Sequence, residues 1–202
     1  MRVVKKICGA YLGPSNTLTM PILDTPLPGL KIIEPRVFED ERGYFYEAYN
    51  AKVFAEAGID ADFVQDNQAR STYGVLRGLH YQVGEHAQAK LVRVIEGEVL
   101  DVVVDIRKSS PTYGRWFSIR LSAENKRQLF VPRGFAHGYA VLSPTAEFFY
   151  KCDNFYSKEH EGGIRYDDPS IGIDWELPAD KIILSEKDER QPVFEGHRPV
   201  MI

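Results

Sequence analysis

Short apolar runs rich in Val, Ile, Phe and Tyr recur roughly every ten residues along this chain, separated by Gly, Pro, Asn and Asp. Such runs predict β-strands joined by short loops, and the sequence has no alternation of strands with long helical segments. Only residues 51–57, between Asn50 and Gly58, predict a helix. We therefore expect an all-β sandwich or barrel of the jelly-roll type. The predicted strands are 30–38, 44–49, 63–69, 75–82, 90–96, 98–107, 116–121, 128–131, 138–142 and 146–152.

The length of 202 residues predicts a single domain, residues 20–202, after an extension, residues 1–19, that we expect to have no catalytic role. Beyond about residue 157 the apolar pattern loosens, which predicts an irregular tail that wraps the sandwich. The net charge of −4 argues against nucleic acid as a partner, and no apolar run is long enough to span a membrane. The two cysteines, Cys8 and Cys152, form neither a metal motif nor a disulfide framework. These features predict a cytoplasmic protein.

The segment 99–106 is mostly apolar on both of its faces, although Asp101 and Asp105 lie on one of them. A strand of this kind needs cover on both sides. One face can meet the core of the sandwich and the other a second subunit, so the sequence predicts a homodimer.

Two strand-like runs carry groups that can transfer protons. In the run 75–82, alternation places Gly78, His80 and Gln82 on one face, and Arg77, Leu79 and Tyr81 on the other. The run 146–152 carries the phenol of Tyr150. An imidazole and a phenol on facing strands could remove a carbon-bound proton from one side of a substrate and return one to the other.

A second histidine, His137, ends the motif Pro132-x-Gly134-x-x-His137, which is the second sequence signature of cupins. In that jelly-roll group this histidine often binds metal. The first cupin signature would fall at His80-Tyr81-Gln82 and has one histidine only. Because metal sites usually offer three or more protein ligands, we expect no metal here. A metal-dependent cupin that uses His80 and His137 is the alternative.

An enolate intermediate needs a positive charge beside its oxygen, and Lys90 is the candidate for that role. A carboxylate should orient the His80 ring and stabilise its imidazolium, with Asp188 as first choice and Asp101 as second. Arg42, in a turn before a strand, is suited to grip phosphate through two donors. Arg77 could supply a second grip, although alternation aims it away from His80 unless the strand bends at Gly78 or a second subunit contributes.

The chain resembles the dTDP-4-dehydrorhamnose 3,5-epimerase family, a cupin-fold group of sugar-nucleotide epimerases. The matching segments run in order across about residues 25–190 and are specific as a set. They are 38–47, 63–67, 75–82, 89–93, 97–102, 110–114, 121–129, 132–138, 146–151 and 184–188.

The resemblance implies conversion of dTDP-4-dehydro-6-deoxy-D-glucose to dTDP-4-dehydro-L-rhamnose, in dTDP-L-rhamnose biosynthesis, by inversion of C3 and C5. In the family's pattern His80 matches the base, Tyr150 the proton donor, Lys90 the group near the C4 oxygen and Asp188 the support of the histidine. Tyr156 falls where a ring stacks on the thymine base. The resemblance also implies a dimer without cofactor. The other positions that match substrate contacts are Arg42, Glu47, Gln65, Asn67, Arg77, His137, Glu161 and Lys187.

Two alternatives stay open beside this interpretation. Relatives invert only C5 or only C3, and one or two pocket residues could decide which. A protein that binds the sugar nucleotide without reacting is a further possibility.

Overall fold

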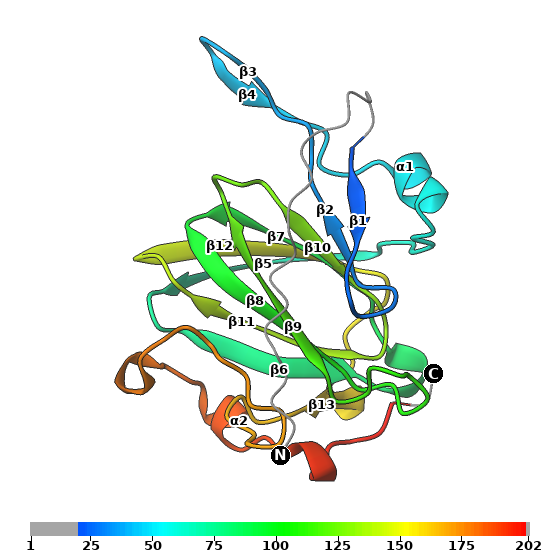
Figure 1. The fold of residues 1–202 in the computed structure, drawn as a ribbon, viewed down its shortest axis with the longest axis vertical. Helices are drawn as coiled ribbons and strands as arrows, with labels where there is room; N and C mark the ends of the chain where they lie inside the picture. Colours follow the sequence, from blue (N-terminus) through cyan, green and yellow to red (C-terminus); the bar gives the residue numbers. More distant parts are fainter. Residues whose placement is uncertain (1–19, 201–202) are drawn as a thin grey trace.

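The computed structural model describes residues 20–200, and the expected extension 1–19 lies outside them. Two β-sheets face each other, and a separate hairpin projects from the sandwich (Figure 1). The prediction of an all-β fold is confirmed. The first sheet has the order β1-β2-β10-β7-β12-β5, with bounds β1 (Ile22–Asp24), β2 (Lys31–Ile33), β5 (Gln65–Thr72), β7 (Lys90–Glu96), β10 (Gln128–Val131) and β12 (Thr145–Cys152).

The second sheet has the order β13-β6-β11-β8-β9, with bounds β6 (Leu76–Gln82), β8 (Glu98–Asp105), β9 (Trp116–Ser122), β11 (Phe135–Val141) and β13 (Glu161–Gly163). The projecting hairpin consists of β3 (Phe38–Asp40) and β4 (Gly43–Phe45). The helical elements are α1 (Ala51–Glu56), α2 (Glu186–Glu189), and the short 3₁₀ turns η1 (Gly84–His86), η2 (Lys158–His160), η3 (Ala179–Lys181) and η4 (Phe194–Gly196).

The space between the two sheets holds the central core. Alternate residues of each strand point into it, because side chains change face at every step along a strand. Val92 and Phe148 come from the first sheet, and Val103 and Tyr139 from the second. Stacked rings of Tyr139 and Phe148, with centroids 4.1 Å apart, join the sheets across this core.

The outer face of the second sheet is covered by the chain's own C-terminal tail. Leu100, Val102 and Val104 of β8 pack there with Ile164 and Trp175 of the tail. Figure 1 shows the tail, in orange and red, running beneath β6. The prediction that the tail wraps the sandwich is therefore confirmed. The reasoning that led from β8 to a second subunit is wrong, because this chain covers that face itself.

The one helix expected from the sequence is present as α1. The side-chain oxygen of Asn50 accepts hydrogen bonds from the backbone N–H groups of Lys52 and Val53, which satisfies donors at the helix start. Phe54 of this helix is buried in a smaller cluster with Ile33 and Leu91, on the outer face of the first sheet.

Several strand bounds differ from the prediction. The run 30–38 is divided into β2 and β3, with Pro35 in the connecting segment, because proline cannot donate to a strand ladder. The run 44–49 is in strand conformation only to Phe45, and β11 begins three residues before the predicted start at Gly138. Among residues 20–200, no helix has the length and apolar character that crossing a membrane requires.

Candidate active site

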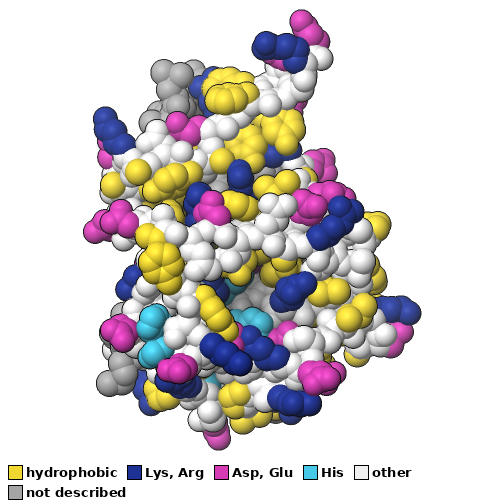
Figure 2. All heavy atoms as spheres, turned by 180° about the vertical axis from the view of Figure 1, so that it is seen from behind, with side chains coloured by type: hydrophobic (Ala, Val, Ile, Leu, Met, Phe, Trp, Pro, Cys, Tyr) yellow, Lys and Arg dark blue, Asp and Glu magenta, His cyan; other side chains and the backbone are white. Residues whose placement is uncertain are grey.

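A cavity of about 250 Å³ opens between the two sheets. Figure 2 shows a hollowed face with histidine side chains in it and lysine and arginine side chains around it. The cavity brings together seven of the residues singled out from the sequence with four others. Its lining consists of Gln65, Asn67, His80, Tyr81, Gln82, Gln88, Lys90, Tyr150, Cys152, Tyr156 and Glu161.

The first sheet contributes Lys90, Tyr150 and Asn67 from three neighbouring strands. Register places Tyr150 of β12 opposite Asn67 of β5, and Cys152 opposite Lys90 of β7. The Lys90 ammonium lies 5.8 Å from the centroid of the Tyr150 ring. The acid candidate and the cation candidate therefore share one wall.

The second sheet contributes His80 from the opposite wall. His80 lies opposite His137 in the pairing of β6 with β11, whereas Arg77 lies opposite Tyr139. Three steps on β6 thus match two steps on β11, which is a β-bulge. The bulge turns Arg77 to the same face as His80, so of the two exceptions to simple alternation considered for Arg77, the structure shows the irregularity at Gly78. On that face the Arg77 Nε donates to the Ser71 hydroxyl at 3.2 Å.

Gly78 makes this bulge possible. Its φ of +137° is accessible to glycine, and a Cβ added there would lie 2.5 Å from the Gly138 Cα. Two glycines on neighbouring strands therefore permit the close backbone approach that aims Arg77 and His80 together.

His80 is paired with Asp188, the first of the two carboxylates considered. The His80 Nε2 lies 2.5 Å from Asp188 Oδ1, and the Ser185 hydroxyl donates to Asp188 Oδ2 at 2.8 Å. Ser185 also caps the start of α2. Burial alone would raise the pKa of Asp188, but the hydrogen bond from His80, its charge and the Ser185 hydroxyl together lower it. Asp188 is thus held as a carboxylate beside the imidazole.

Asp101, the second choice, is paired with His137 instead. Its Oδ2 lies 2.9 Å from His137 Nε2, and both residues are buried. Burial raises the pKa of Asp101, even though the charge of His137 opposes the shift. The cavity lining does not include His137, which the resemblance had placed among the substrate contacts.

Burial shifts the pKa values of both the acid candidate and the cation candidate on the first wall. Burial, with Cys152 and Tyr139 nearby, raises the pKa of Tyr150 to about 12. The phenol is therefore a neutral donor throughout the physiological range. Burial lowers the pKa of Lys90, but the opposing charges of Cys152, Asp101 and Glu161 limit the shift.

Residues of the tail form the rim. The backbone N–H of Tyr156 donates to Gln65 Oε1 at 3.1 Å, and the Tyr156 ring is 53% exposed. Glu161 lies at the rim and forms an ion pair with Lys187 from α2. The exposed ring leaves an aromatic face free for a planar ligand at the cavity mouth.

Arg42 and Glu47 do not line this cavity. Arg42 lies at the turn of the projecting hairpin and binds Asp40, with its Nη2 2.5 Å from Asp40 Oδ2. Glu47 follows the hairpin and accepts a hydrogen bond from the Asn50 amide at 3.1 Å. Within this one chain, the structure does not bring these two residues to the cavity.

Sequence reasoning did not assign site roles to Tyr81, Gln88, Cys152 and Ser185. A signal existed for Cys152, because it lies two residues after Tyr150 and therefore on the same face of the strand. Its thiol contacts the Asn67 amide at 3.7 Å. Ser185 lies outside any strand with alternating residues, so alternation could not place it. Its hydroxyl holds Asp188, which in turn contacts His80.

The metal-dependent alternative requires a group of metal ligands around His80 and His137. In residues 20–200, the grouping of His, Cys, Asp and Glu atoms that is compact enough for an ion does not include His80 or His137. Each of the two imidazoles is instead bonded to one carboxylate.

The family model described as dTDP-4-dehydrorhamnose 3,5-epimerase matches residues 24–196, which contain both walls and the rim. The chain belongs to this family. An epimerase of that name from Shigella flexneri is 59% identical over 170 residues, which cover 84% of this chain and 93% of the relative.

Solved structures of the family share the fold. The enzyme from Elizabethkingia anophelis NUHP1 is 59% identical with a TM-score of 0.85, and the match covers 87% of this chain and 97% of that one. The epimerase from Legionella pneumophila Philadelphia 1, in complex with dTDP-4-keto-L-rhamnose, is 49% identical with a TM-score of 0.86, over 91% of this chain and 100% of that one. The resemblance stated from the sequence is confirmed, and so is the cupin jelly roll.

Proposed function

We propose that this protein is a 3,5-epimerase that converts dTDP-4-dehydro-6-deoxy-D-glucose to dTDP-4-dehydro-L-rhamnose, in dTDP-L-rhamnose biosynthesis. One observation supports the chemistry above all others: His80 and Tyr150 approach the same cavity from opposite sheets, with Lys90 beside Tyr150. Inversion of a carbon centre requires a base on one side of the sugar ring and an acid on the other.

The first step is removal of a proton next to the C4 ketone. Asp188 holds the Nε2 of His80, which leaves Nδ1 as the nitrogen that can accept the proton. The electron pair of the broken C–H bond moves to the ketone oxygen, and His80 becomes an imidazolium. The carboxylate of Asp188 stabilises this cation.

The enolate oxygen needs an electrostatic partner while it carries the charge. Lys90 supplies an ammonium from the first sheet, in a site where burial strengthens its field. The positive charge of Lys90 would then balance that of the enolate oxygen.

The second step is proton return from the other side. The Tyr150 phenol donates its proton to the same carbon, the C4 ketone re-forms, and Tyr150 is left as a phenolate. Exchange with solvent then removes the proton from His80 and restores that of Tyr150. The same pair can act at C5 and at C3 in separate cycles.

The remaining predicted contacts hold the nucleotide. Tyr156 would stack on the thymine base, and Arg77, on the same face of β6 as His80, would contact an anionic group. Gln65 and Asn67 offer polar contacts on the first wall, and Glu161 and Lys187 do so at the rim.

A homodimer is part of the proposal, for a reason that differs from the sequence argument. Phe38, Tyr44 and Phe45 of the projecting hairpin are 51%, 59% and 71% exposed. A second protomer would bury these rings, and Arg42 and Glu47 would then lie at the cavity of that second protomer. Sedimentation of the purified protein as a monomer at micromolar concentration would contradict this part. The cytoplasmic location remains a prediction.

The direct test is solvent exchange. The protein is incubated in deuterated water with the 4-keto sugar nucleotide, and the sugar is examined by NMR and mass spectrometry. Deuterium at both C3 and C5, with an L-rhamno product, is the expected result. Deuterium at one carbon would make the protein a single-site epimerase. Binding without any deuterium would leave a sugar-nucleotide binding protein and remove the enzyme.

A further inference from the structure

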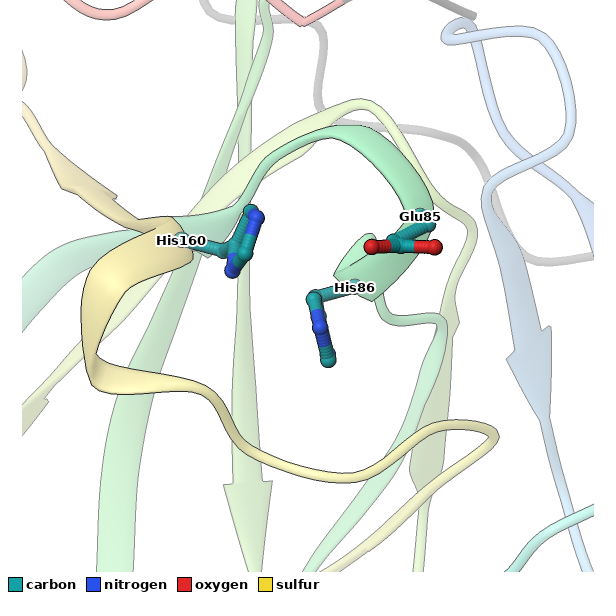
Figure 3. A group of neighbouring side chains, drawn as sticks. All are labelled: Glu85, His86 and His160. Carbon is teal, nitrogen blue, oxygen red and sulfur yellow. The ribbon is translucent and has the colours of Figure 1, made fainter.

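Two histidines and a glutamate form a second cluster away from the catalytic residues. Glu85 and His86 lie in η1, and His160 ends η2 (Figure 3). One ligand atom from each residue lies within 4.8 Å of the other two. The two imidazole rings have centroids 4.3 Å apart. None of these residues lines the catalytic cavity.

One buried nitrogen of the cluster lacks a hydrogen-bond partner. The Nδ1 of His86 is buried and has no hydrogen bond within the described part of the chain. A buried ring nitrogen without a partner is uncommon in folded proteins. A bound ion in this cluster is one way to account for it.

The backbone around the cluster is already held in place. The N–H of Val83 donates to the carbonyl of His160 at 2.9 Å, and the amide of Asn154 donates to the carbonyl of Glu85 at 2.7 Å. The amide of Gln88 in turn donates to the carbonyl of Asn154 at 2.8 Å. Because these bonds fix both turns, little backbone order has to be gained when a ligand binds.

The orientation of His160 is also set. Its Nδ1 lies 2.8 Å from the hydroxyl of Ser157, which leaves Nε2 of the same ring for another ligand. A hydrogen bond on the far ring nitrogen is the usual support of a metal-binding histidine.

We propose that Glu85, His86 and His160 bind a divalent transition-metal ion such as Zn²⁺, at a site separate from the catalytic cavity. Ligand atoms of a tetrahedral Zn²⁺ with bonds of about 2.1 Å lie roughly 3.4 Å apart, so the three atoms, within 4.8 Å of one another, are already near the spacing that the ion requires. The fourth position is left for water. Two imidazoles and one carboxylate favour Zn²⁺, Cu²⁺ or Ni²⁺ over Mg²⁺ or Ca²⁺.

The site has a consequence for the rim. η2 lies between Tyr156 and Glu161, both of which line the cavity mouth. An ion that joins η1 to η2 should therefore raise the melting temperature of the folded protein, and the increase should grow with the logarithm of the free ion concentration above its Kd.

Titration of the tag-free protein with Zn²⁺ tests the proposal. Calorimetry should show one ion per chain, and Co²⁺ in its place should give the visible absorption of a tetrahedral site. His160→Gln should weaken Zn²⁺ binding more than tenfold, and Ser157→Ala should weaken it by about tenfold. Glu159→Gln is the matched control, because it removes a neighbouring exposed carboxylate outside the cluster, and it should bind like wild type.

Two results would overturn the site. The first is a double variant, His86→Gln with His160→Gln, that is folded by circular dichroism and binds Zn²⁺ as tightly as wild type. The second is loss of Zn²⁺ binding in His80→Ala, which would move the ion to the catalytic cavity. Unchanged Zn²⁺ affinity in His80→Ala, with loss in the double variant, is the expected result, and it does not depend on the epimerase activity.

Discussion

The molecule has two histidine–aspartate pairs whose histidines lie on neighbouring strands of one sheet, and the pairs differ in exposure and in the origin of the carboxylate. His80 and His137 are opposite each other in the pairing of β6 with β11. The His80 side chain is 27% exposed and lines the cavity, whereas that of His137 is 8% exposed and does not. Asp188 reaches His80 from the tail, and Asp101 reaches His137 from the core strand β8.

The surroundings of each carboxylate explain the difference. The pKa of Asp188 is lowered because hydrogen bonds from His80 and Ser185 outweigh burial, and the pKa of Asp101 is raised because burial outweighs its partner. The same two residue types thus give a pair poised for proton transfer at the cavity and a pair that is part of the core. Access and hydrogen bonding decide the role, and the residue types alone do not.

The largest expected effect follows from removing the exposed imidazole. His80→Ala should lower deuterium incorporation at both carbons by about 10²–10⁴-fold, because a general base contributes that much. Binding of dTDP, measured by calorimetry, should stay within a few-fold of wild type. An exchange rate within a few-fold of wild type would place the base elsewhere.

Removing the cation should have the next largest effect. Lys90→Met should lower kcat by roughly 10²–10³-fold, because one electrostatic contact to a developing oxyanion is lost. Lys151→Met is the matched control, since Lys151 is on the next strand and pairs with Asp66 outside the cavity. Steady-state kinetics of both variants checks this, and equal losses would contradict the role of Lys90.

Asp188 acts through His80, and its removal should therefore lower kcat less than removal of His80 or Lys90. Asp188→Asn should lower kcat by roughly tenfold to a hundredfold, the cost of a misoriented catalytic group, with KM nearly unchanged. A rise in KM at constant kcat would mean that Asp188 has a purely structural role.

The smallest expected effects concern the stability of the fold. Its dependence on pH should have opposite signs for Asp188 and Asp101. Asp188, with its pKa lowered, stabilises the fold above about pH 4 and loses that contribution as pH falls through its folded-state pKa. Asp101, with its pKa raised, makes the fold less stable as pH rises from about 4 through its folded-state pKa.

This prediction is checked by measuring the melting temperatures of wild type, Asp188→Asn and Asp101→Asn between pH 3 and 7. We expect the melting temperatures to differ on the order of degrees. The advantage of wild type over Asp188→Asn should grow as pH rises to about 4, and its advantage over Asp101→Asn should shrink above that pH. The same pH trend in both variants would contradict the contrast between the pairs.

Period-two alternation predicted most of the fold, because strands of a sandwich bury every second residue. It placed the strands of the core near their observed bounds, and the flanking Asn50 and Gly58 did the same for the helix 51–57. It could not predict that the tail covers the outer face of β8. An irregular segment, such as the one around Trp175, has no regular spacing of apolar residues from which its packing could be predicted. That gap is why the sequence argument assigned this face to a second subunit.

The site was predictable to the extent that it depends on single strands. Tyr150 and Lys90 face the cavity as alternation requires, but the bulge at Gly78 reversed the expected direction of Arg77. The pairing of His80 with Asp188 spans two segments far apart in the sequence, and the residues alone left Asp101 open as the second choice. Clusters formed by turns, such as that of His86 and His160, carry no sequence period at all.

The most direct test of the central claim, that His80 and Tyr150 act on opposite sides of one sugar ring, is the ratio of deuterium exchange to inversion in Tyr150→Phe. Proton abstraction by His80 should survive, so the recovered substrate should carry deuterium at C3 or C5 with its original configuration, while the epimerised product should be scarce. Full inversion by Tyr150→Phe at the wild-type rate would show that another group supplies the second proton, and the two-wall arrangement would lose its role.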